Sequence, residues 1–435
     1  MKPPPPPSPP RRAIRGRLLS FKADPRLHGA AAYTYVEDGL VLVEGGLICA
    51  VGEAAPLLKT LPSGTPVDHF PGKLILPGFI DTHLHFPQTR VIASYGAQLL
   101  EWLHKYTFVE EQKFGDSAHA AAAAKFFFDE LLANGTTTAA VYGSVHPQSI
   151  EAFFIESERR STRMIAGKVM MDTNAPEALR DTPQLSYDDS RALLLKWHGR
   201  GRQLYAITPR FAITSTAAQL EAAGALAREF PQAYVQTHLC ENHAEIALAR
   251  SLYPERSGYT DIYRHYGLLG AKTLLGHCLH LAEDEVDMLA NSGSVAVFCP
   301  TSNLFLGSGL FNRARLLGHA VRIGLATDIG GGTSYSMLVT ASEAYKVLQL
   351  QGQTWPAVEA FWQMTLGNAQ ALGLADKIGK LEAGMEADII VLNASATPAM
   401  AHRMESVDGD LAGELFVLMM LGDERAVERV YLGGG

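Results

Sequence analysis

The middle of the chain alternates short apolar runs with longer amphipathic or alanine-rich segments. The apolar runs have the length and composition of buried strands, and segments of helical length separate most of them. Eight such runs predict eight β/α units, an alternation that suggests a closed parallel (β/α)8 barrel of the TIM type. The predicted strands are Lys73–Thr82, Thr136–Tyr142, Met164–Met171, Leu204–Pro209, Ala233–His238, Thr273–His277, Ser294–Phe298 and Val321–Thr327.

Three of the intervening segments have recognisable helix ends. Asp116–Asn134 contains a run of alanines and stops at an Asn-Gly pair, which is typical of a helix C-terminus. Thr216–Phe230 ends before a proline, and Glu283–Asn291 ends shortly before a glycine. These stops predict helices between the strands.

The two ends of the chain have a different character. Short β-like runs broken by turns fill the segment up to Phe70, where no helical periodicity is evident. From Leu381 the pattern returns to β-like runs. We therefore predict a small β-sandwich made of residues 13–72 and 376–432, with the barrel at residues 73–375 between its two parts. Residues 1–12 are mostly proline, which predicts a disordered arm, with a docking peptide as the alternative.

Composition excludes several classes of protein. The 435 residues are 47% hydrophobic and 19% charged, as in a soluble globular protein with a large core. The net charge of −8 argues against a general nucleic-acid or anionic-membrane binder, although a single nucleobase remains possible as a substrate. No apolar run reaches 18 residues, so no transmembrane helix is expected. The four cysteines form no Cys-x-x-Cys motif and suit a reducing cytoplasm.

Side chains with metal-binding chemistry gather at the ends of the predicted strands. His83 and His85 are two residues apart at the end of the first strand, so both point to the same face. His238, His277 and Asp328 end or follow the fifth, sixth and eighth strands. Because the working groups of such a barrel lie at the carboxyl ends of its strands, we expect these five side chains to meet.

This set suits metal-assisted hydrolysis. His83, His85, His238 and Asp328 could hold one Zn²⁺ ion, although the same ligands tolerate Fe²⁺. A bound metal lowers the pKa of its water to about 7, and Asp328 could accept the water's proton. His277 could orient that water, and Glu241, three residues after His238, could carry a proton to a substrate nitrogen.

Each of these residues alone has an ordinary structural explanation. A single histidine is more often packed than metal-bound, Asp328 precedes a glycine run and could form a turn or cap, and Glu241 could be a solvated loop charge. Their common placement at strand ends of one barrel-like pattern favours the metal site over these separate explanations.

The motifs resemble those of the amidohydrolase superfamily over nearly the whole chain. The resemblance is carried by Pro77–His85, by the His238 and His277 strands, by Asp328 and by Gly379–Val391. It implies a (β/α)8 metallo-hydrolase barrel with a β-sandwich built from both chain ends. Many members use two metals bridged by a modified lysine, for which Lys168 on the third strand is the candidate.

The His238-Leu-Cys-Glu241 sequence resembles instead the one-metal aminohydrolase branch, which we favour. In that branch the glutamate is the proton shuttle of a heteroaromatic deamination. The turn that ends in Gln88, the segment Leu100–Phe108 and the run Thr208–Phe211 resemble the guanine-deaminating members. They imply a purine pocket made of Gln88, Arg210, Phe211, Trp102 and Glu241.

The resemblance therefore implies a cytoplasmic homodimer with one Zn²⁺ per subunit that converts guanine to xanthine and ammonia. Two alternatives remain open. One is an aminohydrolase of the same branch that acts on a pterin, a triazine or a modified purine. The other is a barrel that binds without catalysis, against which the complete ligand set argues.

Overall fold

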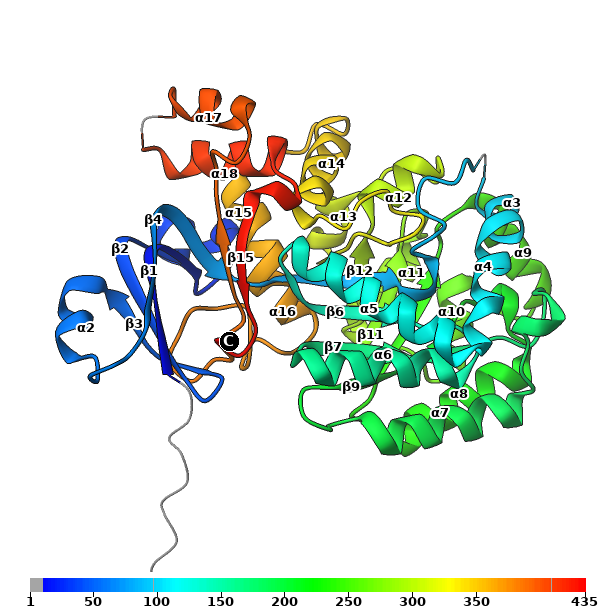
Figure 1. The fold of residues 1–435 in the computed structure, drawn as a ribbon. Coiled ribbons are helices and arrows are strands. Elements are labelled where there is room, and N and C mark those ends of the chain that lie inside the picture. Colours follow the sequence, from blue (N-terminus) through cyan, green and yellow to red (C-terminus); the bar gives the residue numbers. More distant parts are fainter. Residues whose placement is uncertain (1–10, 97, 408) are drawn as a thin grey trace, which may run out of the picture. The chain divides into compact units, whose positions relative to one another are not determined.

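The computed structural model describes residues 11–96, 98–407 and 409–435 (Figure 1). The chain divides into two compact units, Ile80–Pro356 and the two terminal segments Met1–Phe79 and Ala357–Gly435. The arm predicted at residues 1–12 lies outside the described residues except for Arg11 and Arg12, which begin strand β1.

The larger unit contains the expected barrel. Its strands run in the order β5-β6-β7-β9-β10-β11-β12-β13, and every pair with a defined register is parallel. A short strand, β8, pairs with β9 beside this path. The eight strands are β5 (Phe79–His85), β6 (Thr136–Tyr142), β7 (Arg163–Gly167), β9 (Leu204–Pro209), β10 (Tyr234–Leu239), β11 (Thr273–His277), β12 (Val295–Phe298) and β13 (Arg322–Leu325). The predicted fold class is confirmed, and nearly all residues of these strands are buried, as parallel strands covered by helices require.

The segment after β13 returns to β5 and closes the ring. The amide N–H of Asp328 donates to the carbonyl of His83 (2.9 Å), and the N–H of His85 donates to the carbonyl of Ile329 (2.5 Å). The buried carboxyl of Asp81 accepts from the N–H (3.2 Å) and the hydroxyl (2.5 Å) of Thr327. The first strand is thereby tied to the segment after the last strand, although the two are far apart in sequence.

Helices follow most of these strands and surround the ring (Figure 1). The three helices predicted from their ends are confirmed as α5 (Ser117–Ala133), α8 (Ala217–Glu229) and α11 (Glu283–Ser292). The side chain of Asp116 caps α5 by accepting from two N–H groups, and Thr216 caps α8. The others are α6 (Pro147–Arg160), α7 (Pro183–Trp197), α9 (His243–Leu252), α10 (Tyr259–His265), α12 (Pro300–Phe305), α13 (Arg313–Gly318) and α14 (Met337–Gln349).

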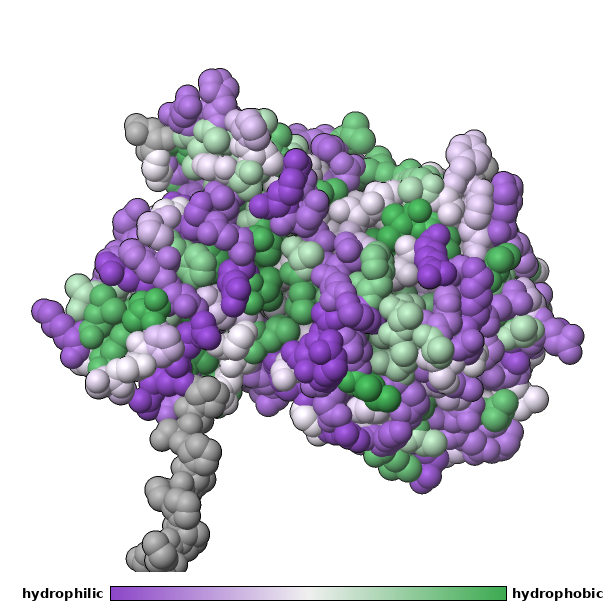
Figure 2. Space-filling model, viewed as in Figure 1, coloured by the Kyte–Doolittle hydropathy of each residue, from purple (hydrophilic) through white to green (hydrophobic). Residues whose placement is uncertain are grey.

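Hydrophilic side chains predominate on the outer surface over these helices in the view of Figure 2. None of the helices in the described ranges is long and apolar enough to cross a membrane.

The connection after β5 is long and partly helical. It contains α3 (Leu99–Trp102), a π-helical turn (Leu103–Thr107) and α4 (Phe108–Glu111) before α5 begins. Leu99, Trp102 and Leu103 line the pocket described below, so this connection forms one of its walls.

The smaller unit is organised around one six-stranded sheet in the order β15-β14-β4-β1-β2-β3. Strands from both chain ends join in it, because β14 pairs with β4 and β15 with β14. The strands are β1 (Arg11–Phe21), β2 (Tyr33–Glu44), β3 (Leu47–Glu53), β4 (Val67–Pro77), β14 (Ile389–Leu392) and β15 (Val427–Tyr431). Apolar side chains from both ends, among them Ile14, Val41, Ile75, Ile389 and Tyr431, form its core.

Helical elements in this unit are α1 (Pro25–His28), α2 (Ala54–Thr60), α15 (Ala357–Trp362), α16 (Asn368–Ala371), α17 (Pro398–Met404) and α18 (Leu411–Leu421). The sequence up to Phe70 shows no helical periodicity, yet it contains α1 and α2, because helices of four and seven residues are too short to show a period. The single strand predicted at Lys73–Thr82 is two strands, β4 and β5, separated at Gly78.

Candidate active site

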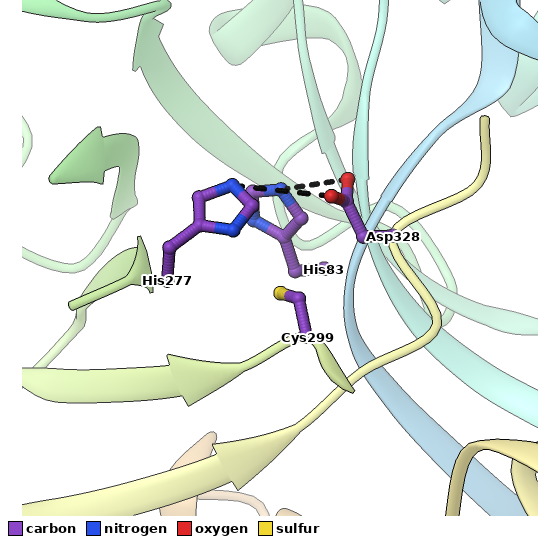
Figure 3. A group of neighbouring side chains, drawn as sticks. All are labelled: His83, His277, Cys299 and Asp328. Carbon is purple, nitrogen blue, oxygen red and sulfur yellow. Dashed lines mark ion pairs between the residues drawn. The ribbon is translucent and has the colours of Figure 1, made fainter. Parts of the chain in front are cut away.

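Four histidines and an aspartate converge at the carboxyl ends of the barrel strands. His83 and His85 end β5, His238 lies near the end of β10, His277 ends β11, and Asp328 follows β13. All five side chains are buried, and Figure 3 shows His83, His277 and Asp328 directed toward one another. The structure therefore brings together the metal-ligand and water-orienting residues predicted from separate strand ends.

The nitrogen and oxygen atoms of these side chains lie close enough together to surround a single ion. Oδ1 of Asp328 lies 3.3 Å from Nε2 of His83 and 3.3 Å from Nε2 of His85. Nε2 of His238 lies 3.2 Å from Nε2 of His85. One ligand atom each of His83, His85 and His238 lies within 4.8 Å of the others.

Hydrogen bonding indicates what this cluster can hold. Nδ1–H of His238 donates to the carbonyl of Arg210 (2.7 Å), which leaves the lone pair of Nε2 directed at His85. Among the described residues, neither ring nitrogen of the buried His83 makes a hydrogen bond, nor does Nδ1 of His85. Three imidazoles and a carboxylate with unsatisfied nitrogens fit a single divalent metal ion, because the ion would replace the missing hydrogen bonds.

The electrostatic surroundings favour the ligand forms of these side chains. Burial lowers the pKa of His85 to about 4 and that of His277 to about 3, and burial also holds the pKa of His238 well below its usual range. Burial alone would raise the pKa of Asp328, but its close polar contacts with His83 and His85 hold it well below its usual value. At neutral pH the site thus presents neutral imidazoles at His85, His238 and His277 beside an ionised carboxylate.

Glu241 lies beside this cluster, and its pKa is shifted in the opposite direction from that of Asp328. Its pKa is raised well above the usual range by burial and by the nearby charges of Glu245 and Asp328. Its Oε2 lies 3.3 Å from Nε2 of His277, and its Oε1 accepts a hydrogen bond from the hydroxyl of Ser308 (3.1 Å). A carboxyl whose surroundings favour its protonated form in this way can act as a general acid.

The backbone at these strand ends is strained. His277 (φ 74°) and Asp328 (φ 53°) occupy the left-handed region, which non-glycine residues enter at a cost of about 1–3 kcal/mol each. Such conformations persist where the surrounding structure imposes them. Here they turn the chain sharply at the points where the side chains must face the cluster.

A pocket opens directly next to the cluster. Gln88, Trp102, Arg210, Phe211 and Glu241, the residues predicted to contact a purine, all line it. Leu99, Leu103 and Leu306 add apolar surface, and Nε1–H of Trp102 donates to the carbonyl of Ser94 (3.1 Å). The pocket therefore combines apolar walls with a few polar groups, as small-molecule sites do.

Lys168, the candidate for a metal-bridging lysine, has other partners. Its buried Nζ forms an ion pair with Asp181 and donates to the carbonyl of Val169 (3.4 Å). With these partners, the amine of Lys168 is engaged away from the histidine cluster.

Several neighbouring residues escaped prediction. Cys299 follows β12 and lies beside His83 and Asp328 (Figure 3), so the strand-end rule could have found it. Burial raises the pKa of this thiol well above its usual value, which keeps it protonated and makes it a poor ligand. Nδ2–H of Asn303 donates to Nδ1 of His277 (2.9 Å). Glu111 lies in the connection after β5, where no sequence signal points to it.

A (β/α)8 barrel with imidazoles and a carboxylate clustered at its strand ends defines a metal-dependent hydrolase. The sequence profile of the amidohydrolase family matches residues 74–434. The chain belongs to this family.

Individual relatives are similar over almost the full chain. The guanine deaminase of Escherichia coli K12 is 49% identical over 405 residues, which are 93% of this chain and 92% of that protein. The structure of E. coli guanine deaminase superposes with a TM-score of 0.95, covering 97% of this chain and 98% of that one at 48% identity. The structure of guanine deaminase from C. acetobutylicum with bound guanine superposes with a TM-score of 0.86 at 28% identity, covering 98% of this chain and 99% of that one.

Proposed function

We propose that this protein hydrolyses guanine to xanthine and ammonia. The observation that carries the proposal is that the candidate metal ligands and the candidate purine-binding residues line the same pocket. His85, His238 and Asp328 lie on it together with Gln88 and Arg210. A planar base held by Gln88 and Arg210 would present a ring carbon to the metal ligands. The similarity to guanine deaminases over nearly the whole chain supports guanine as that base.

The residues that would hold the metal are His83, His85, His238 and Asp328. When bound, the metal supplies a water that is acidic enough to lose a proton near neutral pH. We propose Zn²⁺, which three imidazoles and one carboxylate suit, and Fe²⁺ is compatible with the same ligands. Metal analysis of the protein as purified distinguishes the two.

Proton movement is assigned to two carboxyl groups. The ionised Asp328 accepts a proton from the attacking water, whose oxygen forms a bond to C2 of guanine. Glu241, which keeps its proton because burial raises its pKa, delivers that proton to the adjacent ring nitrogen. Asp328 then passes the proton it took from water to the exocyclic nitrogen, the C2–N bond breaks and ammonia leaves. The hydroxyl on C2 returns its proton to Glu241 as it becomes the carbonyl of xanthine.

His277 is assigned an orienting role. Its Nδ1 accepts a hydrogen bond from Nδ2–H of Asn303 (2.9 Å), so the neutral ring carries its proton on Nε2. That Nε2–H is directed at Glu241 (3.3 Å) and Asp328 (3.9 Å). It can therefore hold the attacking oxygen between the two carboxyl groups.

Substrate recognition is assigned to four side chains. Arg210 offers N–H donors to the purine carbonyl oxygen, and Gln88 offers both a donor and an acceptor to the ring edge. Phe211 and Trp102 supply aromatic faces for the planar base. We also propose a homodimer, as the family resemblance implies, and light scattering on the purified protein tests this. The sparse, scattered cysteines suit the reducing cytoplasm as its location.

A panel of purines, pterins and triazines tests the substrate, with ammonia release as the readout. Guanine should be turned over fastest, with xanthine as the second product. Rapid turnover of another ring without turnover of guanine would overturn the substrate assignment. A metal-loaded protein that turned over no member of the panel would instead favour a binding role.

A further inference from the structure

A buried carboxylate lies behind the purine pocket. Glu111 ends helix α4 and is fully buried, with 0% of its side chain exposed. Its side-chain hydrogen bonds run to Gln88 and Arg210, the two polar residues assigned above to purine recognition. Both of those residues line the pocket, whereas Glu111 is set behind them. One side chain thus connects both halves of the recognition site.

Glu111 determines which way the Gln88 amide points. A carboxylate can only accept hydrogen bonds, so the group that faces it must be Nε2–H of Gln88, which donates over 2.9 Å. On the other side, the N–H of Gly330 donates to Oε1 of Gln88 (3.3 Å). The Gln88 amide is therefore held in one orientation by hydrogen bonds at both Nε2 and Oε1. Its second N–H and its remaining oxygen lone pair are free for a ligand only in that orientation.

Glu111 also fixes and neutralises Arg210. Nη1 of Arg210 lies 2.9 Å from Oε1 and 2.7 Å from Oε2 of Glu111. The guanidinium lies 5.5 Å from the ring centre of Phe108 and 5.8 Å from that of Phe211. Its buried Nε has no hydrogen-bond partner among the described residues. Because Arg210 lines the pocket and its ion pair with Glu111 is neutral overall, the pocket gains N–H donors without a net positive charge.

We propose that Glu111 is a positioning residue that sets the selectivity of the pocket for a neutral purine, an inference that rests on the proposed function. It holds Gln88 and Arg210 in one pattern of donors and acceptors. It also cancels the charge of Arg210, so the pocket binds a neutral carbonyl-bearing ring in preference to a purine anion. Glu111 itself touches neither the substrate nor the reacting atoms.

Glu111→Gln tests both parts of this role. The amide can donate as well as accept, so Gln88 is no longer held in one orientation, and the charge of Arg210 is no longer balanced. We expect kcat/KM for guanine to fall about 10- to 100-fold, mainly through KM, because charge-assisted hydrogen bonds are lost. At alkaline pH xanthine is anionic. We therefore expect the variant to bind xanthine more tightly, relative to its binding of guanine, than the wild type does.

The ratio of KM for guanine to the inhibition constant of xanthine is the decisive measurement. It should rise about tenfold or more in Glu111→Gln, because an unbalanced cation favours an anion. A residue with a merely structural role would weaken both ligands alike and leave the ratio unchanged, and that result would overturn the proposal. Inactive wild-type protein would instead refute the proposed function itself.

Two further variants complete the test. Glu111→Asp keeps the charge but is one methylene shorter, so KM for guanine should rise while the ratio stays within about threefold of wild type. If Glu111→Gln does not fold, this variant decides alone, and a wild-type KM would overturn the positioning role. Glu110→Gln is the matched control, since Glu110 pairs with Lys113 and does not line the pocket. It should match wild type in every readout.

Discussion

Nε2 of His277 lies 3.3 Å from Oε2 of Glu241, and both side chains are almost fully buried. The two groups have opposite tendencies, since the pKa of His277 is lowered to about 3 while that of Glu241 is raised well above its usual range. The imidazole of His277 therefore stays neutral, and the surroundings of Glu241 favour its protonated form. This arrangement prepares the carboxyl to give a proton and the ring to hold a polar neighbour in place.

Glu241→Gln should retain its metal but lose most turnover. The amide has nearly the same size and can still accept from Ser308, but it cannot release a proton at neutral pH. We expect kcat for guanine to fall about 10²- to 10⁴-fold, the usual contribution of a general acid–base group. Ammonia release and metal content are measured on the same preparation. Nearly full activity would show that the proton shuttle is assigned to the wrong residue.

His238→Ala should lose the metal itself. His238 supplies an imidazole whose Nε2 is aimed at the cluster by the bond from Nδ1–H to the carbonyl of Arg210 (2.7 Å). Metal content by elemental analysis should fall from about one per chain to well below that, with activity lost in parallel. His243→Ala is the control, because His243 is exposed at the start of α9 and belongs to none of the described metal-ligand groups. Its metal content should be that of the wild type.

Arg210→Lys should weaken guanine binding although the charge is kept. A lysine can still pair with Glu111, but it lacks the planar fork that leaves a separate donor for the ligand. We expect KM for guanine to rise about 10- to 100-fold with metal content unchanged. Arg180→Lys, at an exposed position, is the control. An unchanged KM in Arg210→Lys would remove Arg210 from the recognition site.

Acid should destabilise the metal-free protein through its buried histidines. The pKa of His85 is lowered by burial from 6.5 to about 4, so an unfolded chain binds a proton there that the folded chain does not. The stabilisation is complete above pH 6.5 and is lost as the pH falls toward 4, by about 1.4 kcal/mol per pH unit for each such histidine. The melting temperature of metal-free protein should fall over this range, and His85→Asn should show a smaller fall. If the melting temperature of His85→Asn fell as steeply with pH as that of the wild type, His85 would not be a source of the acid sensitivity.

Much of the barrel could be predicted from the sequence because its signals are local. The apolar runs at Thr136–Tyr142, Leu204–Pro209 and Thr273–His277 coincide with β6, β9 and β11 residue for residue. A buried parallel strand is apolar at nearly every position, so its length can be read from the run itself. The end of each run then marks where a side chain enters the site, which is how His277 could be found.

The chain's own sequence therefore determined most barrel strands, the ends of α5, α8 and α11 and the spacing of His83 and His85, since each depends on residues that are neighbours along the chain. Only the tertiary structure decided the ties between Asp81 and Thr327 that set Asp328 beside His83. It alone also decided that Glu111 pairs with Gln88 and Arg210, up to 99 residues apart in sequence. Glu111 lies in the connection after β5 and not at the end of a strand, so no local sequence pattern indicates where its side chain points. Its direction depends on partners that follow other strands of the barrel.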